Sequence, residues 1–280
     1  MKKYLKAAFF LAFLAPFLVN AQQLTIGKPS WEYGVFGGIS NYMGDLAPDP
    51  IFKESHPAFG LLLKRNANNY FSYCLDFTVG KISGNDSNSK SLAPRGLNFQ
   101  SNIYEASFQI EFNFFSFSTV NIRGTQRISP YVFSGLSLFH FDPTSTYNGQ
   151  TYHLQGLSTE GQGFAEGAPS PYKLTQLAIP LGGGIKFNLS NAFNIAVLAG
   201  YRATFTNYLD DVGGVYAPKS QIQEHKGNAA AFFSDPTNYA SNSAIPGLQR
   251  GNPDRNDWYM FYGIVLSYVV PPPNCPKFTR

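Results

Sequence analysis

The chain has 280 residues, with 21 Lys and Arg against 17 Asp and Glu, 16% aromatic residues and only 14% charged residues. Three of the basic residues, Lys2, Lys3 and Lys6, lie within the first 21 positions, and 21 minus 3 leaves 18 basic against 17 acidic side chains in the remainder. A nearly neutral chain without a Lys- and Arg-rich run lacks the positive surface that nucleic-acid binding requires, so no nucleic-acid partner is expected.

Residues 1–21 have the three-part pattern of a secretory signal peptide. The three lysines precede the apolar run 7–19, and a small-residue cleavage pattern ends at Ala21. The next residue is Gln22 and not a lipid-accepting Cys, and the apolar run is too short for a membrane-spanning helix. We therefore predict an exported protein whose mature chain begins at Gln22.

Alternation of apolar and polar residues organises the rest of the chain. It is cleanest at residues 104–114 (YEASFQIEFNF), where every second residue is apolar. Eleven residues is long for a soluble strand, whereas a tilted membrane strand needs about 9 to 11. In chain order, we predict eight strands at residues 31–40, 57–65, 70–80, 104–114, 128–141, 176–188, 193–205 and 258–270.

The predicted links between these strands alternate in length. The links after the second and sixth strands are short (66–69 and 190–191), and the link after the fourth is moderate (116–127). The others are long and rich in Gly, Pro, Asn and Ser, at residues 41–56, 81–101, 142–171 and 206–257. Short periplasmic turns and long extracellular loops produce this alternation in bacterial barrels.

The predicted fold is therefore all-β, an eight-stranded antiparallel transmembrane β-barrel formed by residues 22–270. Its location is the outer membrane, whose lipid contacts the apolar strand faces. Residues 271–280 form a periplasmic tail after the last strand. We expect no further domain.

The faces opposite the apolar ones are predicted to line the lumen. They carry three cationic and three anionic side chains: Lys64, Lys186, Arg202, Asp76, Glu105 and Glu111. In a barrel of eight strands the interior is about wide enough for side chains to fill it. We expect a packed, salt-bridged interior, with a gated solute pathway as the alternative.

One histidine deserves consideration as a catalytic group. His140 and Asp142 lie two residues apart at a strand end, but no Ser on a defined elbow accompanies them. An interface histidine followed by a turn at Asp142 and Pro143 accounts for the same residues. We predict no catalytic site, no cofactor and no enzymatic activity.

The candidates for a metal site are Asp210 and Asp211. Together with Asp235, Asp254 or Asp257 they offer carboxylates of the kind that bind calcium, although the spacing matches no known metal loop. The alternative is that these acids cap backbone N–H groups in turns. No metal is predicted.

Five short stretches occur in order along the mature chain: EYGV at 32–35, NYMGDL at 41–46, RATFTNYLDDV at 202–212, DWY at 257–259 and CPKF at 275–278. Together they resemble the PorG-like family of outer-membrane barrels of Bacteroidota, a domain of unknown function associated with the type IX secretion system. The resemblance implies a non-catalytic component that anchors a periplasmic ring formed by a lipoprotein and its partner subunit. Alternatives are a small barrel with an envelope-structural or solute-related role, and a surface hydrolase.

The tail contains one of the two cysteines of the chain. The three prolines at 271–273 cannot pair as a strand, and they favour an extended segment that places Cys275 roughly 15 Å from the barrel rim. Cys74 faces the lumen, beyond the distance of about 7 Å that a disulfide allows between Cα atoms. We expect Cys74 to be an inert thiol, and Cys275 to pair with another protein or to be a free thiol at a docking site. The candidate contacts with the ring lipoprotein are Cys275, Pro276, Lys277 and Phe278.

Overall fold

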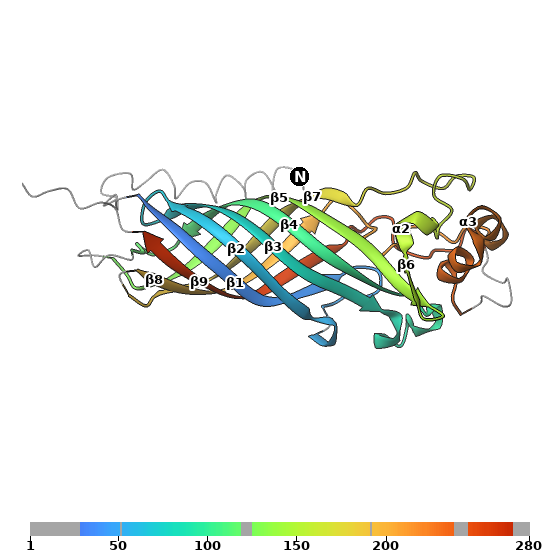
Figure 1. The fold of residues 1–280 in the computed structure, drawn as a ribbon, viewed down its shortest axis with the longest axis horizontal. Helices are drawn as coiled ribbons and strands as arrows, with labels where there is room; N and C mark the ends of the chain where they lie inside the picture. The colour runs from blue at the N-terminus through green and yellow to red at the C-terminus, as the bar shows by residue number, and fades with distance from the viewer. Residues whose placement is uncertain (1–28, 51, 119–124, 191, 238–245, 271–280) are drawn as a thin grey trace, which may run out of the picture.

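A computed structural model describes residues 29–50, 52–118, 125–190, 192–237 and 246–270 (Figure 1). The predicted signal peptide at 1–21 and the predicted tail at 271–280 lie outside the described residues. None of the helices in the described ranges is long and apolar enough to cross a membrane.

Eight antiparallel strands form a closed barrel, which confirms the predicted fold class (Figure 1). Each strand pairs with its neighbour in the chain, and pairing of β1 with β9 completes the circle. The barrel strands are β1 (Ser30–Met43), β2 (His56–Asn66), β3 (Phe71–Asn85), β4 (Asn98–Asn113), β5 (Ile128–Tyr147), β7 (Thr175–Asn188), β8 (Phe193–Thr204) and β9 (Trp258–Val270). Each of the eight predicted strands overlaps one of these.

Several strands continue further than the sequence predicted. The predicted loops at 81–101 and 142–171 were too long, because β3 runs to Asn85, β4 starts at Asn98 and β5 runs to Tyr147. Polar and small residues obscure the alternation there, but Ile82 and Phe99 still point inward and are buried. Beyond the barrel, β5 also pairs with the short strand β6 (Gln150–His153), which the sequence did not predict. These extensions form a sheet that projects past the barrel on one side.

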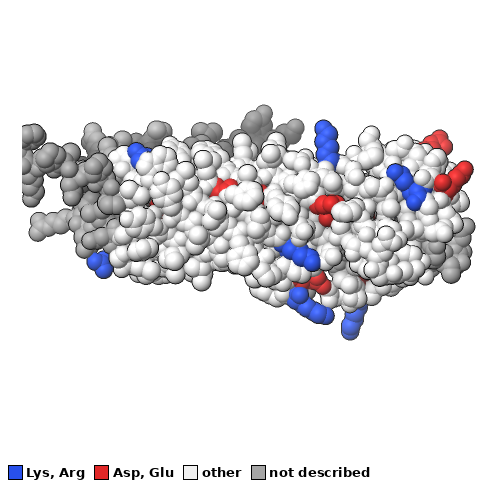
Figure 2. All heavy atoms as spheres, in the orientation of Figure 1, with Lys and Arg blue, Asp and Glu red and all other residues white. Residues whose placement is uncertain are grey.

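The outer face of the barrel is an apolar belt. Leu61, Phe108 and Leu136 have exposed fractions of 64%, 45% and 63%, far above the usual values for large apolar residues in a soluble core. Charged side chains gather mainly over the half of the molecule toward the long loops, and most of the wall is uncharged on the face that Figure 2 shows. This belt is the lipid-facing surface of a transmembrane barrel.

The connections separate by length between the two ends of the barrel. The turns at 67–70, 114–127 and 189–192 lie at one end, called here the short-turn end. Four longer segments lie at the other end, at 44–55, 86–97, 148–174 and 205–257, and their described parts are called the cap. The cap contains helices α2 (Leu154–Leu157) and α3 (Lys219–Ser234), together with 3₁₀ turns η2 (Phe52–Glu54), η3 (Asp86–Asn88) and η4 (Ala93–Arg95).

We predict that Phe108→Arg destabilises the barrel by about 2 to 4 kcal/mol, because it places a cation near the middle of the apolar belt. The same change at Phe52, which is 82% exposed in the cap, is the matched control and should be nearly neutral. Urea unfolding of the protein in lipid vesicles, followed by heat-modifiable migration on gels, measures the difference. Equal tolerance at the two positions contradicts a lipid-facing wall.

Candidate functional site

A buried carboxylate near the short-turn end joins three strands across the lumen. Glu111 on β4 accepts hydrogen bonds from Lys64 of β2 at 3.0 Å and from Lys186 of β7 at 2.5 Å. Lys186 Nζ also lies 4.3 Å from the centre of the Tyr131 ring. Because all three charged side chains are almost completely buried, removal of one partner would leave an uncompensated charge in the lumen.

Glu32 is a fourth lumen carboxylate that the sequence analysis did not single out. It is buried and accepts hydrogen bonds from Asn66 at 3.0 Å, from Asn194 at 3.3 Å and from the Ser267 hydroxyl. The alternation rule could have identified it, since Glu32 lies between the outward-facing Trp31 and Tyr33.

A second charged layer lies nearer the cap. Arg202 on β8 donates to Glu105 on β4 through Nε at 3.1 Å and Nη2 at 3.0 Å, and the Tyr259 hydroxyl donates to Glu105 at 2.5 Å. The Arg202 guanidinium also lies 4.6 Å from the centre of the Phe261 ring. These contacts satisfy the buried charge of the pair with charge-assisted hydrogen bonds.

Asp76 lies beside this layer and has a different type of partner. It accepts hydrogen bonds from Ser107 at 2.5 Å and from the Gln109 amide at 2.6 Å. The six predicted lumen residues therefore all face the interior: two of the carboxylates pair with the three cations, and Asp76 is held by neutral donors.

The remaining space in the lumen is small. A cavity between the two charged layers, lined by Lys64, Cys74, Asp76 and Arg202 among others, has a volume of about 50 Å³. That is room for roughly three or four water molecules. Toward the cap, Phe139 and Phe141 stack on each other, and Phe141 stacks on Tyr172. The interior is packed as the sequence predicted for a barrel of this size.

Two arginines join the four segments of the cap. Arg95 donates to the backbone oxygens of Asp45 at 2.9 Å and of Arg250 at 2.6 Å. Arg250 is buried and donates to Glu160 at 2.9 Å and to the backbone oxygen of Asp211 at 2.7 Å. Arg95 thus links segments 44–55 and 86–97 to 205–257, and Arg250 links 148–174 to 205–257. The cap is one folded unit rather than four independent loops.

Asp211 is part of this cap network. Its carboxylate accepts hydrogen bonds from Thr159 at 2.5 Å and from the Tyr172 hydroxyl at 2.8 Å. Burial raises the pKa of Asp211 to about 6, and the nearby Arg250 opposes that rise. With its oxygens occupied by donors from segment 148–174, Asp211 acts as a hydrogen-bond acceptor that joins two segments.

Asp210 points the other way and meets two further carboxylates. Oxygens of Asp45, Asp210 and Asp257 all lie within 4.8 Å of one another. The Tyr42 hydroxyl donates to Asp210 at 2.5 Å and lies 3.5 Å from Asp257. Of the partners that the sequence analysis considered for Asp210, only Asp257 is present, and Asp45 was not considered. Asp235 is 3.6 Å from Lys219, and Asp254 is exposed.

The donors around this acidic cluster show how it is accommodated. Backbone N–H groups donate to it from Val212 at 2.9 Å, Leu209 at 3.0 Å and Asn252 at 3.0 Å. Burial raises the pKa of both Asp210 and Asp257 well above the usual range, and the neighbouring carboxylates raise it further. Calcium takes six to eight oxygen ligands, whereas this cluster offers three carboxylates already engaged by donors. The geometry suits carboxyl groups that retain protons.

The histidines do not form a hydrolytic triad in the described part of the chain. His140 contacts Thr175 at 2.9 Å, and Asp142 instead contacts His153 at 2.6 Å. His56 contacts Ser83 at 2.8 Å, but Ser83 donates its own hydroxyl to Glu54. In a catalytic triad the acid contacts the histidine, and the serine hydroxyl donates to the histidine. Here the serine hydroxyl donates to the acid instead, so the three residues are not arranged as a triad. Cys74 is buried in the lumen, and the candidates Cys275, Pro276, Lys277 and Phe278 lie outside the described residues.

Residues 7–229 match the model of a protein family described as a domain of unknown function, DUF6089. The chain belongs to this family. A comparison with curated proteins found no match. The family's description names no activity, so it adds no role for the lumen or the cap of this DUF6089 barrel.

Three solved structures are similar to the DUF6089 barrel. The attachment invasion locus protein Ail of Yersinia pestis is 12% identical, with 87% of this chain and 100% of that chain covered and a TM-score of 0.42. Neisserial surface protein A is 10% identical, with coverage of 86% and 99% and a TM-score of 0.40. The outer membrane protein OprG from Pseudomonas aeruginosa is 11% identical, with coverage of 87% and 98% and a TM-score of 0.37.

We predict that the cluster of Asp45, Asp210 and Asp257 contributes more to the stability of the cap at acid pH than at neutral pH. The folded pKa of Asp210 and Asp257 lies above the unfolded value of about 3.9, so their stabilisation is complete below that value and is lost as the pH rises through the folded pKa. Each unit of elevation corresponds to about 1.4 kcal/mol. Asp257→Asn keeps a neutral side chain at every pH and should flatten this dependence.

Thermal unfolding between acid and mildly alkaline pH, without divalent cations and then with calcium, measures the effect. Asp254→Asn, at an exposed position in the same segment, is the control and should behave as wild type. A wild-type protein that gains stability relative to Asp257→Asn as the pH rises contradicts the protonated cluster. Strong stabilisation by calcium of the wild type but not of Asp257→Asn contradicts it as well.

Proposed function

We propose that this chain is an integral outer-membrane barrel that serves as a non-catalytic anchor in a type IX protein secretion machine. In this role it holds a periplasmic ring, formed by a lipoprotein and its partner subunit, beneath the outer membrane. The outer membrane is the location that an apolar-walled β-barrel with an export signal favours.

The observation that carries an anchoring role is the filled interior beneath a folded cap. Buried ion pairs occupy the lumen, aromatic rings lie above them, and Arg95 and Arg250 tie the cap segments together. An interior built in this way gives rigidity at the expense of transport. Such a barrel offers surfaces at its two ends rather than a passage between them.

The short-turn end supports a periplasmic docking role. Trp31 at the start of β1 lies beside Val270 at the end of β9, so the chain enters and leaves the barrel at this end. If the short-turn end faces the periplasm, as short turns do in bacterial barrels, Trp31 and Val270 lie at the end that a periplasmic partner would contact. The type IX role itself depends on the resemblance of the five short stretches to the PorG-like family. A solute-related role fits the packed lumen poorly, and a hydrolase fits the arrangement of His56, Ser83 and Glu54 poorly.

The proposal predicts that the barrel is recovered together with a ring lipoprotein when native outer membranes are dissolved in mild detergent. It also predicts a higher-mass band on non-reducing gels that Cys275→Ser abolishes, because Cys275 is the cysteine outside the barrel. Cys74→Ser is the matched control, since Cys74 is buried in the lumen, and it should keep the band.

Two results bear against parts of this proposal separately. Recovery of the barrel without any secretion component contradicts the anchoring role. A wild-type protein that runs as a monomer, with full partner recovery and secretion in Cys275→Ser, leaves the anchor but removes the role of the thiol.

A further inference from the structure

The lipid-facing wall over β3, β4 and β5 is hollowed near its middle. Ala106 on β4 pairs with Phe77 on one side and with Leu138 on the other, so a methyl group lies between two large side chains. A shallow hollow of about 640 Å³ opens there. Its apolar lining includes Leu61, Phe77, Ala106, Phe108, Leu138 and Leu177. This hollow has the width and chemistry to take hydrocarbon chains.

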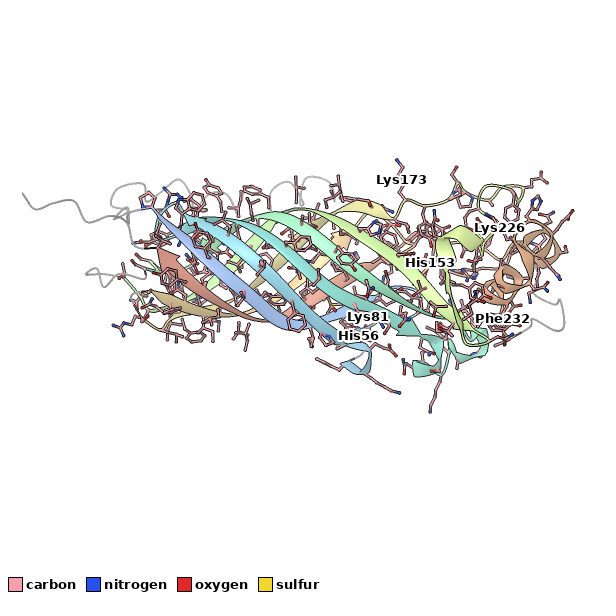
Figure 3. The ribbon with its side chains drawn as sticks, in the orientation of Figure 1. His56, Lys81, His153, Lys173, Lys226 and Phe232 are labelled. Atoms are coloured by element: carbon pink, nitrogen blue, oxygen red, sulfur yellow. The ribbon has the colours of Figure 1, made fainter. Side chains whose placement is uncertain are left out.

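A polar groove lies over β3, β4, β5 and the end of β6, one step closer to the cap. It has a volume of about 250 Å³, and its lining includes Lys81, Gln100, Asn102, Tyr104, Asp142 and His153. Tyr104 lies two residues from Ala106 on β4, and it pairs with Val79 and His140. The groove therefore begins where the hollow ends. In Figure 3, Lys81 lies beside His56, whose pKa is lowered by burial and by the charge of Lys81, and His153 lies nearer to α2 and β6.

The charges of the groove favour an anion at one position. None of the ion pairs among the described residues includes Lys81. The acid of the groove, Asp142, is already engaged by His153 Nδ1 at 2.6 Å, and His140 Nδ1 contacts Thr175. An anionic group that enters the groove meets Lys81 together with the amide groups of Gln100 and Asn102. A lysine near the surface of a membrane attracts an anionic lipid headgroup by about 1 kcal/mol.

We propose that the β3–β4–β5 wall binds one lipid of the leaflet on the cap side whose phosphorylated headgroup carries a net negative charge, with its hydrocarbon chains over Ala106 and its phosphate against Lys81. The apolar hollow lies nearer the middle of the membrane, and the polar groove lies nearer its surface. This order matches that of the hydrocarbon chains and the headgroup of a lipid. The inference depends on the proposed membrane location and is independent of the secretion role. The bound lipid covers the hollow and occupies the groove, and it thereby fixes the projecting sheet at the membrane surface.

The test uses the full mature protein reconstituted in phosphatidylcholine nanodiscs containing lipid A, a phosphorylated glycolipid, or its dephosphorylated form. Native mass spectrometry after gentle release measures the lipid that each protein retains. Lys81→Gln probes the groove, with Lys226→Gln on α3 as its control. Ala106→Phe probes the hollow, with Ala199→Phe as its control, because Ala199 is an exposed wall residue on β8. Heat-modifiable migration verifies that every variant is folded.

The wild-type protein should retain one lipid A. The amount retained by Lys81→Gln should be about fivefold lower, which corresponds to about 1 kcal/mol for one lysine near a charged membrane surface. Ala106→Phe should lower retention of both forms of the lipid, and the two controls should match wild type. Equal retention of phosphorylated and dephosphorylated lipid overturns the phosphate site. Equal losses in Ala106→Phe and Ala199→Phe overturn the chain site.

Competition with inorganic phosphate separates a lipid site from a simple anion site. Soluble phosphate should leave the lipid bound, because the hydrocarbon chains contribute to retention, and complete displacement overturns the proposal. A wild-type protein that does not insert into any nanodisc contradicts the membrane location, which is a different failure from insertion without lipid retention.

Discussion

The structure depends on the compensation of charge inside a barrel whose outside is apolar. Because successive residues of a strand face opposite sides, a wall that presents leucine and phenylalanine to lipid must present its polar residues to the lumen. Eight strands leave no room for bulk water around them. Each buried charge must therefore find its partner on another strand, as Glu111 does with Lys64 and Lys186. These pairs fix which strands face one another and seal the interior at the same time.

The cap applies the same requirement to backbone groups. Arg95 and Arg250 donate hydrogen bonds to carbonyl and carboxylate oxygens of different cap segments. Buried acceptors of one segment are therefore hydrogen-bonded by another. The acidic cluster of Asp45, Asp210 and Asp257 is accommodated inside the cap because backbone N–H groups donate to its carboxylates and because burial raises the pKa of Asp210 and Asp257, which favours their neutral form. The packed lumen and the folded cap leave the two ends and the apolar wall as the surfaces that other molecules can contact, as the proposed anchor requires.

The barrel was largely predictable, whereas the cap was not. The alternation of apolar and polar residues shows which face of a strand points into the lumen. It therefore located the strands and the six lumen residues. The same rule applied to β1 would have added Glu32. The rule fails toward the cap, where the outward positions of β3 and β4 become polar, as at Lys81 and Asn102, although Ile82 and Phe99 still point inward, and the strand ends there were missed. The partners of Asp210 and Arg250 come from segments that are distant in sequence, and no local spacing encodes such contacts. Asp45 is distant in sequence from Asp210 and Asp257, so no local pattern indicated that it belongs to the acidic cluster.

The most direct test of the sealed interior is the conductance of the purified wild-type protein in planar lipid bilayers, with a general porin reconstituted in parallel as a positive control. The structure predicts no stable open state, because buried ion pairs and stacked rings fill the lumen and leave a cavity of only about 50 Å³. Reproducible channels of uniform conductance from the folded wild-type barrel would contradict the account, and with it the claim that this barrel is an anchor rather than a pore.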